Sequence, residues 1–300
     1  MSRRKIIFSY SNKTEKLYYI YNLSIEKYPK LATFISTIRK VSGWNLGNIL
    51  LPDSLPLKEK IRQVKNKYKR PAIREALSSF EIILNNAKVE EDFKRYWFKN
   101  KVFLENEICR LYLVTNWIKV LNTIEKITRR KIPRETIHVN ISFSVSPNDY
   151  GFTFTYKILL VIHPRCTSWK YIMTIIHELL HPVLQNPAWY TRNPALYKKV
   201  NYLLKHSNIS FPSGYPNSQL YFEENLVEAL TLYISEKIPY LIDLPHNIKE
   251  IYYDYWDSRN LILAKPLYIM LSNYDHTKYT AIDDYIYKCM KTISSISDII

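Results

Sequence analysis

The hydrophobic positions of the chain follow two periods, and each period predicts one kind of element. From about residue 90 to residue 130 the apolar residues recur three or four positions apart, which is typical of one long helix or of two joined helices. In residues 137–145 every second side chain is apolar, which predicts a β-strand. Residues 152–162 are expected to return as the hairpin partner of this strand, after the turn-forming segment 147–151.

A second group of helices is predicted in the C-terminal half of the chain. Ser168 can cap a helix whose apolar residues continue to position 180, and Pro182 is expected to end or kink that helix at His181. A loop region rich in proline and asparagine is expected to follow, up to about residue 217. Helical spacing is also present at residues 195–205, 218–237, 248–264 and 281–300. This order of strands and helices predicts an α+β fold.

The N-terminal part of the chain is predicted to be basic and mainly helical. Residues 6–10 alternate between apolar and polar before a polar turn, and residues 17–21 are expected to complete a β-hairpin. One helix is predicted at residues 24–40. Another is predicted at residues 58–70, where seven of thirteen residues are lysine or arginine. These seven residues are Lys58, Lys60, Arg62, Lys65, Lys67, Lys69 and Arg70.

The strongest chemical signal is the sequence His177-Glu178-Leu179-Leu180-His181. Two histidines four residues apart on a helix project from the same face, so both imidazoles can bind one Zn²⁺ ion. The glutamate beside the first histidine lies where it can take a proton from a water on the metal. The motif therefore predicts a zinc site with His177 and His181 as ligands and Glu178 as the general base.

A catalytic zinc ion usually has three protein ligands, so one more ligand must come from elsewhere. Gln185 and Pro187 occupy positions that exclude the histidine-rich continuations of the motif. The three cysteines of the chain are far apart, which argues against a cysteine zinc site or a disulfide framework. The third ligand is therefore expected to be a carboxylate on a later helix.

The predicted helix at residues 218–237 offers such carboxylates. Glu224 and Glu228 are four residues apart and share one face of the helix, and Glu223 precedes them. One glutamate can bind the metal while another accepts the second N–H of a ligating histidine, which fixes the tautomer of the ring. The residues by themselves leave Glu223, Glu224 and Glu228 open as the third ligand.

The HExxH motif and the glutamate helix resemble the gluzincins, metallopeptidases whose third zinc ligand is a glutamate on a helix after the motif helix. In their ExxxD pattern the first acid binds zinc and the last acid supports it, which implies Glu224 as the ligand and Glu228 as the residue that orients a histidine. The resemblance also implies a zincin-like catalytic domain with a small mixed sheet, the motif helix, the glutamate helix and C-terminal helices. Its edge strand would pair with an extended peptide, and residues 152–162 are the candidate.

The chemistry implied is hydrolysis of a peptide bond. Zinc lowers the pKa of its water towards about 7 and polarises the scissile carbonyl, while Glu178 accepts the proton and passes it to the leaving amine. A group that stabilises the developing oxyanion is also expected. The candidates are Tyr215, Tyr221, His206 and His246.

The net charge of +16 lies before the zinc motif. Residues 1–135 contain 29 lysine and arginine residues against 13 acidic ones, whereas residues 136–300 contain 14 of each kind. A basic region of this kind suits nucleic acid or another polyanion as a partner. The seven basic residues of the segment 58–70 are the candidates for contacts with nucleic-acid phosphates.

The hydropathy of the chain predicts a cytoplasmic protein without a transmembrane segment. Only three consecutive apolar residues follow the initial basic cluster, which is too few for a signal peptide. No apolar run approaches the ~20 residues that span a bilayer.

These observations predict two regions and two alternative functions. Residues 1–88 are expected to form a basic, mainly helical N-terminal region, and residues 89–300 a zincin-like metallopeptidase domain. The first hypothesis is a zinc-dependent peptidase that hydrolyses peptide or protein substrates through a water activated by Glu178. The alternative is a nucleic-acid-associated regulatory protein whose zincin fold is structural or cuts a single partner protein.

Overall fold

The structure is a computed structural model, and it combines many helices with a small sheet, as expected for an α+β chain. Two compact units can be distinguished. The sheet unit consists of Ile6–Leu113 and Ile137–Thr167, and the helical unit of Met1–Lys5, Val114–Thr136 and Ser168–Ile300. The residues described by the structure are 5–11, 15–16, 19, 57–67, 71–132, 136–143, 150–154, 157–162, 167–185, 188–206, 215, 217–238 and 244–291.

The sheet has four strands in the order β1-β2-β4-β3. β2 and β4 run parallel, with Ile141 opposite Leu160, and β3 runs antiparallel to β4. Ile137, Val139 and Ile141 of β2 are buried, as the period of two predicted, but Asn140 and Ser142 between them are buried as well, so the second half of the strand is covered on both faces. The strands are β1 (Lys5–Tyr10), β2 (Thr136–Phe143), β3 (Tyr150–Phe154) and β4 (Lys157–Ile162).

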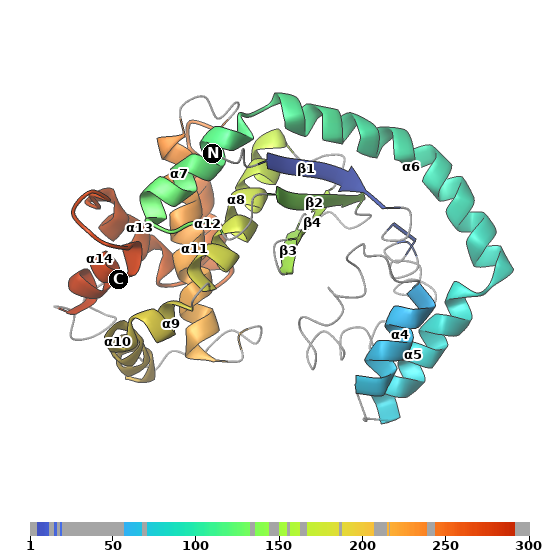
Figure 1. Ribbon diagram of the computed structural model, residues 1–300, viewed down its shortest axis with the longest axis horizontal. Helices are drawn as coiled ribbons and strands as arrows, with labels where there is room; N and C mark the ends of the chain where they lie inside the picture. Colours follow the sequence, from blue (N-terminus) through green and yellow to red (C-terminus); the bar gives the residue numbers. More distant parts are fainter. Residues whose placement is uncertain are drawn as a thin grey trace. The chain divides into compact units, whose positions relative to one another are not determined.

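Residues 152–162 do not form one strand that pairs with β2 as a hairpin, so this prediction was wrong. β3 and β4 are separate strands that pair with each other, and β4 lies parallel to β2 (Figure 1). Parallel neighbours need a long connection, and here β3 supplies the reversal of direction on the way. β3 is therefore the edge strand beside β4, whereas β4 lies inside the sheet.

The predicted N-terminal hairpin is only half correct. Its first strand is β1, but Tyr19, the position of the predicted second strand 17–21 that the structure describes, is helical, so the second strand was a wrong prediction there. A short continuous run of apolar and aromatic residues, as at residues 17–21, does not by itself distinguish a strand from a helix. The helix predicted at residues 24–40 lies outside the described residues.

The basic segment is helical up to Lys67, as predicted, while residues 68–70 lie outside the described part, and two further helices follow in the sheet unit. The last of these, α6, packs against β1: the amide of Phe8 donates to the hydroxyl of Tyr112 over 2.9 Å, and the hydroxyl of Tyr10 donates to Glu105 over 2.8 Å. The helices are α4 (Leu57–Lys67), α5 (Pro71–Leu84) and α6 (Ala87–Leu113).

The helical segment predicted at residues 90–130 consists of two helices. α6 ends at Leu113, and α7 (Trp117–Thr128) begins after Asn116, whose side chain accepts a hydrogen bond from the amide of Lys119. An asparagine at this position satisfies an amide that has no partner within the helix, which explains where the second helix starts. The boundary predicted between the N-terminal region (1–88) and the metallopeptidase domain (89–300) falls inside α6. A functional division of the chain at that point stays a prediction.

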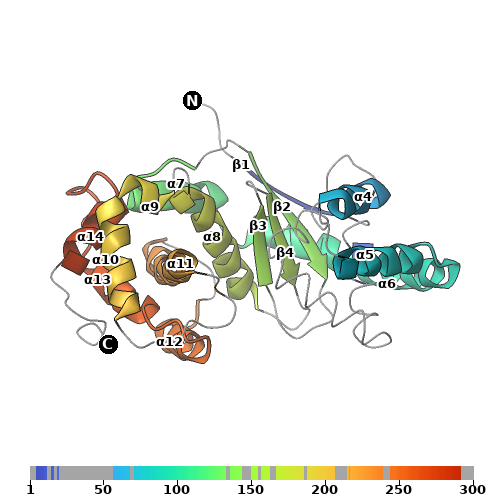
Figure 2. The same cartoon turned by 90° about the horizontal axis from the view of Figure 1, so that it is seen from below.

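The helical unit is built around α11, which Figure 2 shows nearly end-on among α8, α10, α12 and α13. Nearly every residue from Tyr221 to Ser235 is buried, so α11 is surrounded on all sides. α8 and α13 are its main packing partners. The helices of this unit after α7 are α8 (Ser168–Gln185), α9 (Trp189–Arg192), α10 (Pro194–Lys205), α11 (Ser218–Lys237), α12 (Ile248–Ser258), α13 (Ala264–Ser272) and α14 (Ile282–Lys291).

Three C-terminal predictions are confirmed and one needs correction. The helices predicted at residues 195–205, 218–237 and 281–300 correspond to α10, α11 and α14, although residues 292–300 lie outside the described part. The helix predicted at residues 248–264 ends earlier, at Ser258. Asn260 then adopts a left-handed conformation, with φ at 55°, which a continuous helix does not allow, and α13 begins at Ala264.

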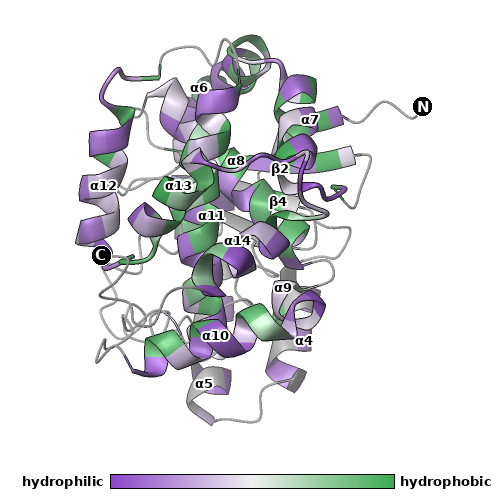
Figure 3. Ribbon diagram, turned by 90° about the vertical axis from the view of Figure 1, so that its left-hand side faces the viewer, coloured by the Kyte–Doolittle hydropathy of each residue, from purple (hydrophilic) through white to green (hydrophobic). Residues whose placement is uncertain are grey.

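Hydropathy along the described helices is mixed. Figure 3 shows α10 with hydrophobic and hydrophilic residues side by side, and its apolar residues Leu196, Val200 and Leu203 are buried. Among the described residues no helix combines the length and the apolar character needed to cross a membrane.

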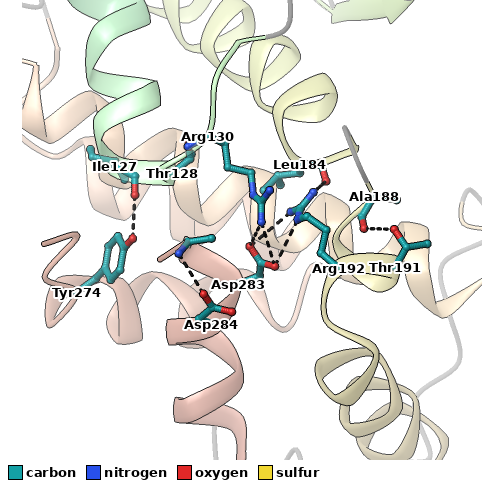
Figure 4. A network of polar contacts seen from close by, with 11 residues as sticks. Ile127, Thr128, Arg130, Leu184, Ala188, Thr191, Arg192, Tyr274, Asp283 and Asp284 are labelled. Atoms are coloured by element: carbon teal, nitrogen blue, oxygen red, sulfur yellow. Dashed lines mark hydrogen bonds and ion pairs between the residues drawn. The ribbon is translucent and has the colours of Figure 1, made fainter. Parts of the chain in front are cut away.

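A buried ion-pair cluster joins three elements of the helical unit (Figure 4). Asp283 on α14 is 2% exposed and lies 3.1 Å from Nη2 of Arg130, which follows α7. Nε of Arg192 on α9 lies 3.5 Å from the same carboxylate. Arg192 also donates from Nη1 to the carbonyl of Leu184 over 2.8 Å, at the C-terminal end of α8. The cluster therefore fixes the end of the helix that carries the HExxH motif.

Candidate metal centre

α8, the helix that carries the motif, is apolar on more than one face. Ile172, Ile175, Ile176 and Leu180 are each at most 1% exposed, so the helix is embedded in the unit over most of its length. His177 and His181 lie on the remaining strip and keep partly exposed side chains.

The sequence predicted that Pro182 ends or kinks the motif helix at His181. α8 does not end there, so the predicted end was wrong. The helix includes Pro182 and continues to Gln185. Proline removes one helical hydrogen bond and disfavours the helical conformation of the residue before it. The residues after it compensate, because Val183 and Leu184 are fully buried and Arg192 satisfies the carbonyl of Leu184. Packing therefore outweighs the local preference and preserves the helical spacing of the two histidines.

α11 places three glutamates opposite α8. Asn217 caps this helix by accepting from the amide of Leu220, which fixes where the helix begins and hence which face each later residue occupies. Glu223 and Glu228 are buried, at 2% and 4% exposure, while Glu224 between them is partly exposed. The three glutamates therefore do not form a solvent-exposed face of α11.

His177, His181 and Glu224 form a group that can hold a metal ion, since one ligand atom from each lies within 4.8 Å of the others. The two Nε2 atoms are 3.2 Å apart. Nε2 of His177 lies 3.6 Å from Oε1 of Glu224, and Nε2 of His181 lies 3.6 Å from Oε2 of the same carboxylate. A tetrahedral ion with bonds of about 2.0–2.1 Å separates its ligand atoms by about 3.4 Å, so the two imidazoles are spaced for such an ion, and the carboxylate turns one oxygen towards each of them.

The other nitrogen of each imidazole faces its own carboxylate. Nδ1 of His177 lies 3.3 Å from Oε1 of Glu228, and Nδ1 of His181 lies 3.0 Å from Oε1 of Glu223. Nε1 of Trp256 on α12 donates to Glu228 over 3.2 Å, which holds that carboxylate in place. Both rings are therefore oriented with Nε2 towards Glu224, as metal-binding histidines usually are.

The acidic surroundings change two pKa values at the centre. Burial acts to lower the pKa of His181, but the hydrogen bond to Glu223 and the charges of Glu224 and Glu178 outweigh it and raise this pKa to about 9. Burial raises the pKa of Glu228, and the neighbouring His177 opposes this effect. His181 is therefore protonated at neutral pH in the metal-free protein, and this proton competes with a metal ion.

We expect metal affinity to rise with pH, because His181 must lose its proton before Nε2 can bind a metal ion. The apparent affinity for zinc should increase about tenfold per pH unit up to about pH 9 and level off above it. Competition with a chromophoric chelator, whose own affinity is calibrated at each pH, measures this dependence. A zinc affinity that stays constant between neutral pH and about pH 9 would contradict the expected proton release.

Glu178, the predicted general base, is on α8 beside these ligands and is 6% exposed. Its charge is one of those that raise the pKa of His181, so the carboxylate lies close to the imidazole pair. It is outside the group of three whose ligand atoms converge. Its position agrees with a residue that acts beside a metal without binding it.

The candidates for an oxyanion stabiliser lie in different environments. Burial raises the pKa of Tyr215, and the charge of Glu224 adds to this, so Tyr215 is near the centre. The hydroxyl of Tyr221 donates to the carbonyl of Asn260 over 2.8 Å and is thus engaged away from it. His206 is at the end of α10, exposed, with Nδ1 2.8 Å from the carbonyl of Tyr202. His246, just before α12, is exposed as well. Of the four candidates, Tyr215 is the one whose pKa shows the influence of Glu224.

The seven basic candidates for nucleic-acid contacts are described only in part. Arg62 is exposed and pairs with Glu59 on α4, and Lys65 pairs with Glu81 on α5. Lys58, Lys60 and Lys67 belong to α4, but their side chains are outside the described part, as are Lys69 and Arg70 entirely. A nucleic-acid partner therefore stays a prediction.

Sequence reasoning missed some of the residues that support the centre. Glu223 was considered only as a metal ligand, and its contact with Nδ1 of His181 was not anticipated. Gln185 donates from Nε2 to the same Glu223 oxygen over 2.6 Å. Trp256 and Tyr255, which contact Glu228, come from α12, and the sequence contains no signal that this helix lies against Glu228. The spacing of Gln185, one helical turn after His181, is a signal that could have been used.

Comparisons of the chain with models of protein families, with curated proteins and with solved structures find no match.

Proposed function

We propose that this protein is a zinc-dependent peptidase of the gluzincin type with a zincin-like fold. The observation that carries the proposal is the convergence of two Nε2 atoms, 3.2 Å apart, and the carboxylate of Glu224, with the buried Glu178 beside them. Two nitrogens and one oxygen form a donor set suited to zinc, and three protein ligands leave a fourth position open for a water.

The reaction follows from the roles of the residues around that open position. A zinc ion held by His177, His181 and Glu224 would supply a Lewis acid that polarises a carbonyl and acidifies a water. Glu178 takes the proton of the attacking water and passes it to the leaving amine. Glu228 accepts the Nδ1 proton of His177 and so keeps Nε2 free to bind the metal. Tyr215, whose pKa the charge of Glu224 helps to raise, is the candidate to donate a hydrogen bond to the developing oxyanion.

The proposed function is tested by incubating the zinc-loaded protein with a mixed library of unstructured peptides and identifying cleaved bonds by mass spectrometry. The expected result is cleavage that stops when a chelator removes the metal and returns when zinc is added back. A protein that contains no bound metal after purification without chelators, or a zinc-loaded protein that leaves the library intact, would contradict the proposal.

The assignment of Glu224 as the third ligand is tested by comparing two substitutions on α11. Glu224→Ala should lower zinc affinity by more than the ~10–100-fold expected for a residue that only orients a ligand. Glu228→Gln should stay within that range, since His177 and His181 keep their Nε2 atoms and Glu224 remains. Competition titrations with a chromophoric chelator give both affinities, and a larger loss for Glu228→Gln would reverse the two roles.

A further inference from the structure

The ring of His181 is contacted on both nitrogens by consecutive residues of α11. Oε1 of Glu223 lies 3.0 Å from Nδ1, and Oε2 of Glu224 lies 3.6 Å from Nε2. Neighbouring residues of a helix point in directions about 100° apart, so two adjacent glutamates can reach the two edges of one imidazole. Glu223 is thereby kept off the face where His177, His181 and Glu224 converge.

Glu223 is buried at 2% exposure, and an ionised carboxylate in such a place is costly unless it is paired. Its Oε1 atom accepts from Nε2 of Gln185 over 2.6 Å and faces Nδ1 of His181. Both of these donors belong to α8, one helical turn apart. The carboxylate is thus aligned by the same helix whose histidine it contacts.

We infer that Glu223 is a positioning residue that holds the His181 ring with its proton on Nδ1 and its Nε2 lone pair directed at the metal position. The inference rests on the proposed zinc site. An imidazole that donates Nδ1–H to a carboxylate is fixed in tautomer and orientation and becomes a stronger base at Nε2.

Each histidine then has its own supporting carboxylate, and the two supports are independent. Glu228 contacts His177 and takes hydrogen bonds from α12 through Trp256 and Tyr255. Glu223 contacts His181 and takes its hydrogen bond from Gln185 on α8. The order along the chain is reversed, since the earlier histidine pairs with the later glutamate, so α8 and α11 run in opposite directions at the centre. Loss of one support should therefore loosen one histidine and leave the other oriented.

The experiment compares zinc affinity in the wild-type protein with two variants of Glu223. Glu223→Gln keeps the shape and an acceptor oxygen but removes the charge, and it should lower zinc affinity about tenfold. Glu223→Leu removes the acceptor as well, and it should lower zinc affinity towards 100-fold. Affinities are measured on the full chain by competition with a chromophoric chelator at and above pH 9, because Glu223 also raises the pKa of His181 and its loss would relieve proton competition at neutral pH. Urea unfolding of the metal-free proteins reports their stability.

A second readout follows the ring itself. Nitrogen NMR of zinc-bound protein with labelled histidine should give a protonated Nδ1 and a metal-bound Nε2 for His181, and this pattern should weaken in Glu223→Leu while His177 is unchanged. Glu250→Gln makes the same chemical change at an exposed site on α12 and serves as the control that leaves zinc affinity unaltered.

The outcomes separate this inference from the proposed function. Glu223 variants that bind zinc as tightly as the wild type would overturn the positioning role, whatever their stability. A wild-type protein that binds zinc tightly and cleaves no peptide would contradict the peptidase while a weakened Glu223→Gln variant still supports the inference. A wild-type protein that binds no zinc would overturn both.

Discussion

Replacement of Glu178 by glutamine should leave zinc binding intact and lower peptide hydrolysis by about 10²–10⁴-fold, the usual contribution of a general base. An amide of the same shape cannot accept the proton of the attacking water. Glu178 is not one of the three residues whose ligand atoms converge, so its substitution removes no metal ligand. Zinc content measured by atomic absorption and cleavage rates on the peptide library give the two quantities.

The matched control for this change is Glu250→Gln, which alters an exposed glutamate on α12 and should preserve the wild-type rate. A Glu178→Gln protein that cleaves peptides normally would show that another residue takes the proton. A variant that loses its zinc would instead identify Glu178 as a metal ligand.

The parts of the centre that could be predicted from the sequence depend on spacing within one helix. The positions of His177 and His181 relative to each other follow from four residues of α-helix, and so do those of Glu224 and Glu228. The bounds of α11 were predictable because helical periodicity and the Asn217 cap mark its start. These features need no knowledge of what the helix packs against.

The role of Glu223 could not be predicted, because it depends on the rotation of α11 relative to α8. A different rotation would present Glu223 to solvent, and the periodicity of α11 does not fix it, since the helix is buried nearly all round. The contacts of Glu228 could not be predicted either, because its partners Trp256 and Tyr255 belong to α12, which is distant in sequence.

Two fold predictions failed because local preference was overridden by longer-range packing. Pro182 normally favours a helix end, but the burial of Val183 and Leu184 keeps α8 helical to Gln185. The strand order failed for a related reason, since alternation marks strands without stating which strands become neighbours.

Replacement of Asp283 by alanine should lower the free energy of unfolding by about 3 kcal/mol, because it removes the partner of two largely buried guanidinium groups. Arg192 is 8% exposed in its side chain and Arg130 is 18% exposed, so water screens neither charge well. Burial already lowers the pKa of Arg192, and Asp283 opposes this effect while Arg130 adds to it. Without the aspartate the two positive charges face each other. Urea unfolding of the metal-free protein measures the loss.

The control is Asp254→Ala, which removes an exposed carboxylate on α12 and should change the free energy of unfolding by no more than about 0.5 kcal/mol. The Asp283 variant should also bind zinc more weakly, because Arg192 holds the carbonyl of Leu184 just after the turn that carries His181 and Pro182. A variant with wild-type stability would mean that the arginines find other partners. One that is destabilised but binds zinc normally would mean that the end of α8 is fixed without Arg192, through the burial of Val183 and Leu184.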